Sequence, residues 1–177
     1  MTLFAAEDIR IESLRQVAAR MLIAAQTAPK ARGQNHLATA FVDGDTIAAL
    51  SQKMAEIGAT ENNPTFARDA ENIRAADVIV LLGTRISPMN LTKCGWCGFE
   101  NCAQKPDATP CAFNTGDLGI ALGSAVSVAT DNRVDNRVMY TVGLAAMSLD
   151  LLGPGVRVAY GIPLSATAKN PFFDRPK

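Results

Sequence analysis

The sequence predicts one α+β domain spanning residues 1–177, with three layers in which a sheet lies between helices. Segments with helical and strand periodicity alternate along the chain, and neither a linker nor a low-complexity stretch separates them. The run 77–83 is almost continuously apolar and has the length of a strand, which indicates a central strand covered on both faces. The run 117–131 is apolar on nearly all sides, which indicates a buried helix.

The N-terminal part predicts a helix followed by a polar loop. Residues 5–27 form the helix, because Leu14, Val17 and Met21 recur on one stripe. A loop of turn composition follows, reading T-A-P-K-A-R-G-Q-N-H-L from position 27. It is an ordinary helix-to-strand connection or, alternatively, a loop that binds an anion or a cofactor. The second interpretation rests on the polar side chains of Lys30, Arg32, Gln34 and Asn35.

The next elements are delimited by capping residues. Residues 37–42 predict a strand, and a helix follows over 46–57. Asp45 is expected to cap the start of that helix, and Gly58 to end it. Asn63 precedes a proline, which predicts the N-cap of a further helix carrying a buried stripe.

The helix over 117–131 is expected to begin after a cap at Asn114 or Thr115. Gly119 and Gly123 lie four residues apart on one of its faces. Each costs about 1 kcal/mol relative to alanine inside a helix, so some neighbour is expected to need the space. That neighbour is a closely packed helix, a partner subunit or a flat cofactor.

The C-terminal part predicts a charged junction, a helix, a strand and a tail. The junction, 131–138, repeats the tetrapeptide D-N-R-V and is expected to contain local Asp–Arg pairs. An apolar helix over 138–152 and a strand over 156–162 follow. The tail contains Phe172 and Phe173, which are expected to dock on this subunit or on a partner.

The principal chemical motif is a cluster of cysteines between the central strand and the buried helix. All four cysteines of the chain occur there with the spacing C-x2-C-x4-C-x8-C, at Cys94, Cys97, Cys102 and Cys111. Thiolates so close in sequence can converge on one soft metal centre. Gly95 and Gly98 allow positive φ angles and bring backbone N–H groups near the sulfurs. The loop 88–114 is therefore expected to bind a cluster, with Trp96 and Phe99 shielding it from water.

Four interpretations of the cysteines remain open. A [4Fe–4S] cluster is favoured because the first three cysteines are closely spaced in a glycine-rich loop. Zinc is the second, although all-cysteine zinc sites usually pair two C-x2-4-C motifs and the chain has one. A disulfide and unrelated buried thiols complete the set.

Composition restricts the partners. The chain has 17 basic and 17 acidic residues, a balance that argues against a nucleic acid or a membrane surface as the partner. No apolar run approaches the roughly 20 residues of a membrane span, and the N-terminus lacks a basic region typical of a secretory signal. A cytoplasmic protein is expected.

Several segments resemble uncharacterised prokaryotic proteins described as containing a ferredoxin domain. They include C-G-W-C-G-F-E-N-C, P-C-A-F-N-T-G-D-L-G-I-A-L-G-S-A, D-N-R-V-M-Y-T-V-G, Y-G-I-P-L-S and P-F-F-D-R. The similarity runs from about Thr27 to the C-terminus. It implies a single [4Fe–4S] cluster on the four cysteines and implies no particular reaction.

The chain is also similar, more faintly, to the flavin-binding nitroreductase fold. The corresponding segments are Ala28-Pro29 with Asn35, then D-L-G-I-A from position 117, and G-I-P at 161–163 with Lys169 or Arg175. Two departures are evident: Lys30 replaces a serine of that family, and the arginine-rich motif that holds the FMN phosphate is missing. The similarity therefore implies a nitroreductase-like sheet and a two-fold dimer more than it implies FMN. If FMN does bind, Lys30, Arg32, Asn35 and Gly119 are the expected contacts.

These features predict a redox protein that passes single electrons through an iron–sulfur cluster. The partners expected are a second copy of the chain and a redox protein. The alternatives are an FMN-dependent oxidoreductase and a non-catalytic interaction module stapled by zinc. Whether the protein is an enzyme stays open in the sequence, and a hydrolase is disfavoured because no Ser/His/Asp or Cys/His set is present.

Overall fold

The computed structural model describes residues 3–173 and contains one four-stranded antiparallel sheet in the order β1-β2-β4-β3. The strands are β1 (Leu37–Asp43), β2 (Val78–Arg85), β3 (Asp135–Asn136) and β4 (Val156–Ser165). The α-helices are α1 (Ala6–Thr27), α2 (Asp45–Thr60), α3 (Pro64–Ile73), α4 (Ala112–Asp131) and α5 (Tyr140–Ser148). Short 3-10 turns are η1 (Ala31–Gly33), η2 (Cys102–Gln104) and η3 (Pro171–Phe173).

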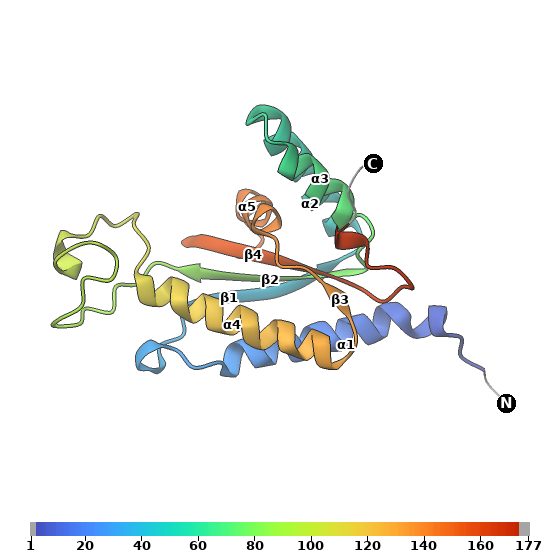
Figure 1. Ribbon diagram of the computed structural model, residues 1–177, viewed down its shortest axis with the longest axis horizontal. Helices are drawn as coiled ribbons and strands as arrows, with labels where there is room; N and C mark the ends of the chain where they lie inside the picture. The colour runs from blue at the N-terminus through green and yellow to red at the C-terminus, as the bar shows by residue number, and fades with distance from the viewer. Residues whose placement is uncertain (1–2, 174–177) are drawn as a thin grey trace.

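Helices cover both faces of the sheet (Figure 1). Helices α1 and α4 pack on one face, and α2, α3 and α5 pack on the other. The predicted α+β fold with a sheet between helical layers is therefore confirmed.

Strand β2 is the centre of the sheet, as its apolar run predicts. It pairs with β1 on one side and with β4 on the other, and its side chains alternate between the two layers. Val80 and Leu82 join the core under α1 and α4, whereas Ile79 and Leu81 join the core under α2, α3 and α5. Full burial of each such side chain contributes about 1.5–3 kcal/mol, so both layers depend on this one strand.

The boundaries of α2 differ from the prediction at both ends. The N-cap is Gly44, whose φ of 53° suits a glycine, and Asp45 is the first helical residue. Gly58 does not end the helix. It is buried within α2, where a Cβ atom would lie 3.0 Å from the Cβ of Phe66 in α3, so it allows the two helices to pack closely. The predicted cap at Asn63 is confirmed, because its side chain accepts a hydrogen bond from the Thr65 amide.

Helix α4 begins earlier than predicted and is not buried on all sides. Its N-cap is Cys111, so the helix starts directly after the last cysteine of the motif. Gly116, Gly119 and Gly123 are exposed, and a Cβ atom at any of them would meet no neighbour within 4 Å. Within the described chain, therefore, nothing occupies the space that these glycines leave.

The segment 131–138 is not a helix junction with local ion pairs. It contains β3, and Asp135 accepts a hydrogen bond from the side chain of Asn170. Arg137 reaches across to the buried Asp69 of α3, with 4.0 Å between Nη1 and Oδ1. The following helix, α5, is correspondingly shorter than the predicted 138–152. Tertiary partners replace local ones because the buried carboxylate needs compensating cations and hydrogen bonds.

The tail docks on its own subunit through Phe172, which is completely buried among α2, α3 and α5. Its carbonyl oxygen accepts hydrogen bonds from the side chains of Arg137 and Asn72. Phe173 is 55% exposed and lies under the Arg137 guanidinium, 5.1 Å from the ring centre. The prediction that the aromatic pair docks is thus confirmed for Phe172, whereas Phe173 stays largely exposed.

We expect Phe172→Ala to lower the free energy of unfolding by about 3–5 kcal/mol, because a large buried side chain leaves a cavity. Phe173→Ala is the matched control and should cost no more than about 1 kcal/mol, since it removes one partly exposed cation–π contact. Urea unfolding followed by circular dichroism measures both. Equal effects would contradict the role assigned to Phe172.

No helix in residues 3–173 combines the length and apolar character needed to cross a membrane.

Candidate metal centre

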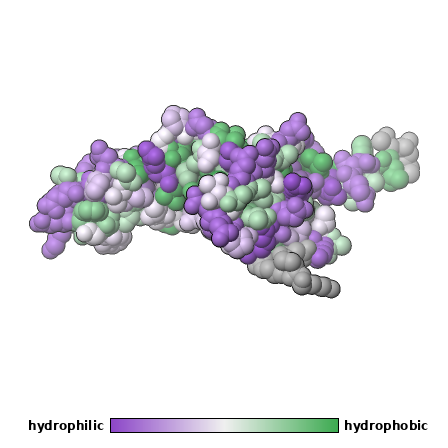
Figure 2. All heavy atoms as spheres, turned by 90° about the horizontal axis from the view of Figure 1, so that it is seen from above, coloured by the Kyte–Doolittle hydropathy of each residue, from purple (hydrophilic) through white to green (hydrophobic). Residues whose placement is uncertain are grey.

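The four cysteines lie in a long connection, residues 86–111, that joins β2 to α4. This connection projects from one end of the sheet, at the left of Figure 1. Figure 2 shows the molecule from above as an elongated body whose end on that side mixes hydrophilic and hydrophobic residues. The cysteines therefore lie at an extremity of the protein, away from the two apolar cores.

All four cysteines line a single small cavity of about 20 Å³. Each is a free thiol, and they range from the exposed Cys94 to the buried Cys111. The walls are largely apolar and include Met89, Phe99 and Phe113. The structure thus gathers around one cavity the residues that the sequence spreads over 18 positions, from 94 to 111.

Glycine conformations shape the first part of the loop. Gly95 and Gly98 have φ angles of 86° and 87°, which other residues rarely adopt. The Gly98 amide donates to the Gly95 carbonyl at 2.9 Å, which closes a turn containing Cys97. Phe99 lines the cavity, as expected for a shielding residue. Trp96 is 74% exposed and stacks on Phe113 of α4, with ring centres 5.0 Å apart and 13° between the planes.

Two contacts fix the base of the loop. The Oδ1 atom of Asn114, in the first turn of α4, accepts a hydrogen bond from the Ser87 amide at 2.7 Å. The Arg32 guanidinium donates to the Met89 carbonyl at 3.1 Å. These contacts tie the start of the cysteine connection to α4 and to the loop after α1. Sequence reasoning gave Asn114 only a capping role, because a contact between positions 27 residues apart leaves no local pattern.

Asn114→Ala is expected to loosen the entry to the cysteine connection, because Asn114 is 1% exposed and its loss leaves the half-buried Ser87 amide without its acceptor. We expect a loss of about 1–3 kcal/mol in unfolding free energy and faster amide hydrogen exchange over 86–93. Thr115→Ala is the control, since the Thr115 hydroxyl donates to a carbonyl of its own helix turn. Unchanged exchange in Asn114→Ala would contradict the assignment.

The arrangement of the donors bears on which metal group fits. Among residues 3–173, no group of three or more His, Cys, Asp or Glu side chains is close enough to hold one metal ion. Structural zinc needs four ligands on one ion at about 2.0–2.3 Å. A cubane cluster places each thiolate on a different iron, so its four sulfurs are spaced more widely around a common volume. Both groups take four cysteine ligands, and the four thiols around this cavity supply that donor set.

The loop after α1 lies beside the candidate metal centre, but its polar groups are mostly engaged within the chain. The Lys30 amine donates to the carbonyls of Ala25, Gln26 and Ala28, at the end of α1. Burial lowers the pKa of Lys30, while the nearby Asp117 carboxylate opposes that change. The Asn35 side chain bonds to Gln26 and to the Leu37 amide.

Helix α4 holds this loop in place. Both carboxylate oxygens of Asp117 lie 3.1 Å from the Ala31 amide, which donates to them. Arg32 has a φ of 55° and donates to Met89 as described above. Gly119 is exposed on α4 one turn beyond Gly116. Lys169, the other cation considered for a flavin, follows β4, and Arg175 lies outside the described residues.

A second, shallow groove adjoins the cysteine cavity. It has a volume of about 350 Å³ and is lined by Pro29, Lys30, Ala31, Trp96, Ala112, Phe113, Gly116, Asp117 and Ile120. Ala112 and Phe113 line both spaces, and Trp96, which stacks on Phe113, lines only the groove. Among the residues considered for a flavin, Lys30 reaches this groove, whereas Arg32, Asn35 and Gly119 are not part of its lining.

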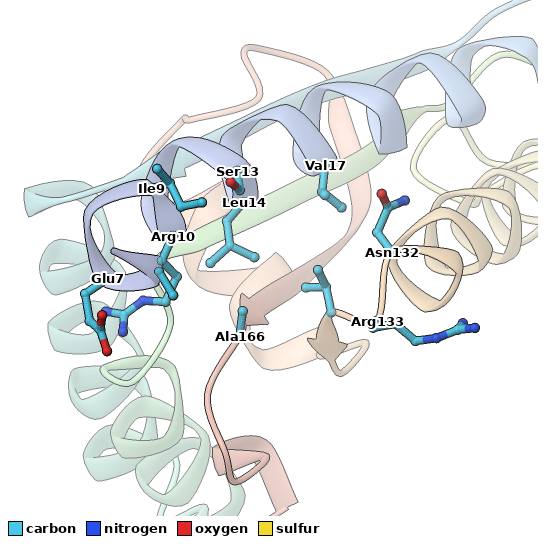
Figure 3. A pocket seen from close by; sticks show the side chains of 11 residues that line it. Glu7, Ile9, Arg10, Ser13, Leu14, Val17, Asn132, Arg133 and Ala166 are labelled. Carbon is cyan, nitrogen blue, oxygen red and sulfur yellow. The ribbon is translucent and has the colours of Figure 1, made fainter. Parts of the chain in front are cut away.

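Another groove, of about 390 Å³, lies between the start of α1 and the end of α4 (Figure 3). Its charged groups do not converge. Arg10 pairs with Asp77, with 3.2 Å between Nε and Oδ2, while Arg133 extends away from the groove and donates to the Thr130 carbonyl. Helix α4 has 20 residues, so this groove is about 30 Å from the cysteine connection. It is not part of the metal centre.

Comparisons with known proteins identify the family of the chain. Residues 107–175 match a family described as "Uncharacterized protein containing a ferredoxin domain". An uncharacterized protein of Archaeoglobus fulgidus is 37% identical over 178 residues, covering 96% of this chain and 95% of the relative.

The solved structures found to be similar include flavoproteins. A BluB-like flavoprotein from Clostridium difficile 630 has a TM-score of 0.58 and 16% identity, covering 92% of this chain and 84% of that one. The FMN-dependent nitroreductase NfnB from Mycobacterium smegmatis, solved with NADPH, has a TM-score of 0.58 and 12% identity, covering 87% and 78%. At these identities the likeness concerns the fold, and it confirms the nitroreductase-like sheet expected from the sequence.

Proposed function

Because the chain belongs to the family described as uncharacterized proteins containing a ferredoxin domain, we propose that it transfers single electrons through a [4Fe–4S] cluster. The proposed ligands are Cys94, Cys97, Cys102 and Cys111. The observation that carries this proposal is that all four cysteines of the chain line one cavity. A bound cluster would accept and release one electron at a time.

The rest of the connection has roles suited to such a cluster. Met89 and Phe99 contribute apolar walls, which exclude water and thereby influence the reduction potential. Gly95 and Gly98 close a turn that contains Cys97, and any backbone N–H of the loop that reaches a thiolate would stabilise its negative charge. Because the connection projects from the body, a redox partner protein can approach it closely. We propose such a protein as the physiological partner.

The experiment that tests the proposal is purification without oxygen, followed by iron and sulfide analysis and absorption spectra before and after dithionite. A broad brown absorption that bleaches on reduction, with equal amounts of iron and sulfide, is the expected result. A colourless protein containing zinc would refute the redox proposal and make the connection a structural staple, whose removal by chelators should unfold it.

The second candidate function is an FMN-dependent oxidoreductase. The shallow groove beside the Trp96–Phe113 stack favours it, because the exposed Trp96 ring, stacked on the half-buried Phe113, offers a surface for a flat ring. The similar structures also include proteins described as FMN-dependent. Of the contacts expected from the sequence, Lys30 lines this groove, whereas Arg32, Asn35 and Gly119 lie outside its lining and would contact parts of FMN that extend beyond it. Two sharper yellow absorption bands and flavin fluorescence after denaturation would identify the cofactor, and their absence from protein purified with added FMN would rule it out.

A homodimer and a cytoplasmic location complete the proposal. The exposed face of α4 that carries Gly116, Gly119 and Gly123 leaves room for a second subunit. Light scattering coupled to gel filtration measures the mass directly, and a monomer at micromolar concentration would contradict the dimer. A reducing compartment suits four free thiols that bind a metal centre.

A further inference from the structure

We propose that Lys105 is the charge-compensating residue of the metal centre and that its ammonium group favours the reduced cluster. The inference rests on the proposed [4Fe–4S] function and adds a residue that lies outside the ligand set. It depends on where Lys105 lies in the cysteine connection, on which atoms its amine contacts and on the absence of any other buried charge in that segment.

Lys105 lies between the third and fourth cysteines and lines the same cavity as all four. Only 6% of its surface is exposed. Its Nζ atom donates to the carbonyls of Pro106, at 3.0 Å, and Thr109, at 2.6 Å. An ammonium group has three N–H donors, so one remains beyond these two bonds formed within the described residues. The side chain therefore braces the turn before Cys111, and Lys105 is itself part of the cavity lining.

Lys105 is the one buried charged residue in segment 86–111, all of which the structure describes. The other three, Lys93, Glu100 and Asp107, are exposed. Burying an ammonium group costs free energy unless an opposite charge lies nearby, and two carbonyl dipoles compensate it only in part. A cluster held by four thiolates carries a net negative charge. A cluster bound in the cavity beside Lys105 would supply the negative charge that the buried ammonium group lacks.

The electrostatic consequence concerns reduction. One electron from an external reductant makes the cluster more negative, while no bond forms or breaks. A cation in a poorly solvated position stabilises the reduced form more than the oxidised form, because screening by water is weak there. An exposed cation such as Lys93 should have little effect, since solvent and salt screen it.

The test compares the wild type with Lys105→Met, Lys105→Arg and the control Lys93→Met, each reconstituted with iron and sulfide without oxygen. Methionine keeps the length of the side chain and removes the charge, whereas arginine keeps the charge. The midpoint potential is measured by spectroscopic redox titration. We expect the ratio of reduced to oxidised cluster at a fixed potential to fall about tenfold in Lys105→Met, which for one electron corresponds to about 59 mV. Lys105→Arg and Lys93→Met should remain close to the wild type.

The outcomes distinguish failure of the proposed cluster function from failure of the role assigned to Lys105. A wild type that binds no cluster refutes the proposed function itself. A loaded Lys105→Met with the potential of the wild type leaves that function intact and overturns the role of Lys105. If Lys105→Met fails to load while Lys105→Arg loads, the positive charge is needed to hold the anionic cluster, which supports the inference. If both variants fail to load, the side chain acts through its shape, and the inference is overturned.

Discussion

Cys97→Ser is expected to abolish the visible absorption of the anaerobically purified protein. Serine retains the size of cysteine but binds iron poorly as a ligand, because its hydroxyl is a harder donor and is not ionised at neutral pH. Loss of a direct ligand should weaken retention by more than the roughly 10–100-fold typical of losing an outer partner. Iron and sulfide content, measured with the absorption spectrum, are the readouts.

Cys97 is the most informative of the four positions. It is half-buried and lies in the turn between Gly95 and Gly98, whereas Cys111 is buried and is the N-cap of α4, so replacing Cys111 also perturbs a helix. Ala103→Ser is the matched control, because it introduces the same exposed hydroxyl beside Cys102 without removing a thiol. Full iron content in Cys97→Ser would refute the ligand assignment, and loss of iron from the control would show that the connection tolerates no change.

Gly143→Ala is expected to have the largest effect on stability of any glycine-to-alanine substitution in the chain. Gly143 lies in α5 where the helix crosses β4, and a Cβ atom there would lie 1.8 Å from the Ala159 carbonyl oxygen. Neither the backbone of α5 nor that of β4 can move aside without disrupting the packing of the helix on the sheet. We expect a loss of at least about 3 kcal/mol, at the upper end of the cost of overpacking. Urea unfolding measures it.

Gly119→Ala is the matched control, and it is expected to raise the free energy of unfolding rather than lower it. It makes the same chemical change in α4, where a Cβ atom would meet no neighbour within 4 Å. The isolated subunit should gain about 0.5–1 kcal/mol, because alanine is the better helix former. Equal destabilisation at the two glycines would contradict the packing described here. If Gly119→Ala instead dissociated a dimer or expelled a flavin, it would identify what covers this face of α4.

Much of the fold could be read from local sequence signals. The apolar run of β2 predicted a central strand, and Asn63 before a proline predicted the start of α3, because both signals act within a few residues. The boundaries at Gly58 and Asn114 were predicted wrongly. Each residue type commonly caps a helix. In the structure, Gly58 instead packs against α3, and Asn114 instead accepts the hydrogen bond from the Ser87 amide.

In the candidate metal centre, too, only some of the features could be predicted from the sequence. The spacing of the cysteines indicated one centre, because four thiols within 18 positions have little freedom to separate. Lys105, Phe113 and Asn114 gave no comparable signal. Lys105 becomes significant only because the loop buries it at the cavity, and Phe113 because α4 starts early enough to place its ring under Trp96.

The sequence alone determined which groups are available: four clustered thiols, two glycines in the loop between them, and an apolar strand before it. Backbone preference and sequence proximity are sufficient for such features, since their energies depend on neighbours along the chain. The tertiary structure decided what surrounds them: the Lys105 cation, the Trp96–Phe113 stack and the open glycine face of α4. These depend on burial and electrostatic interaction between distant segments, and both exist only once the helices have packed on the sheet.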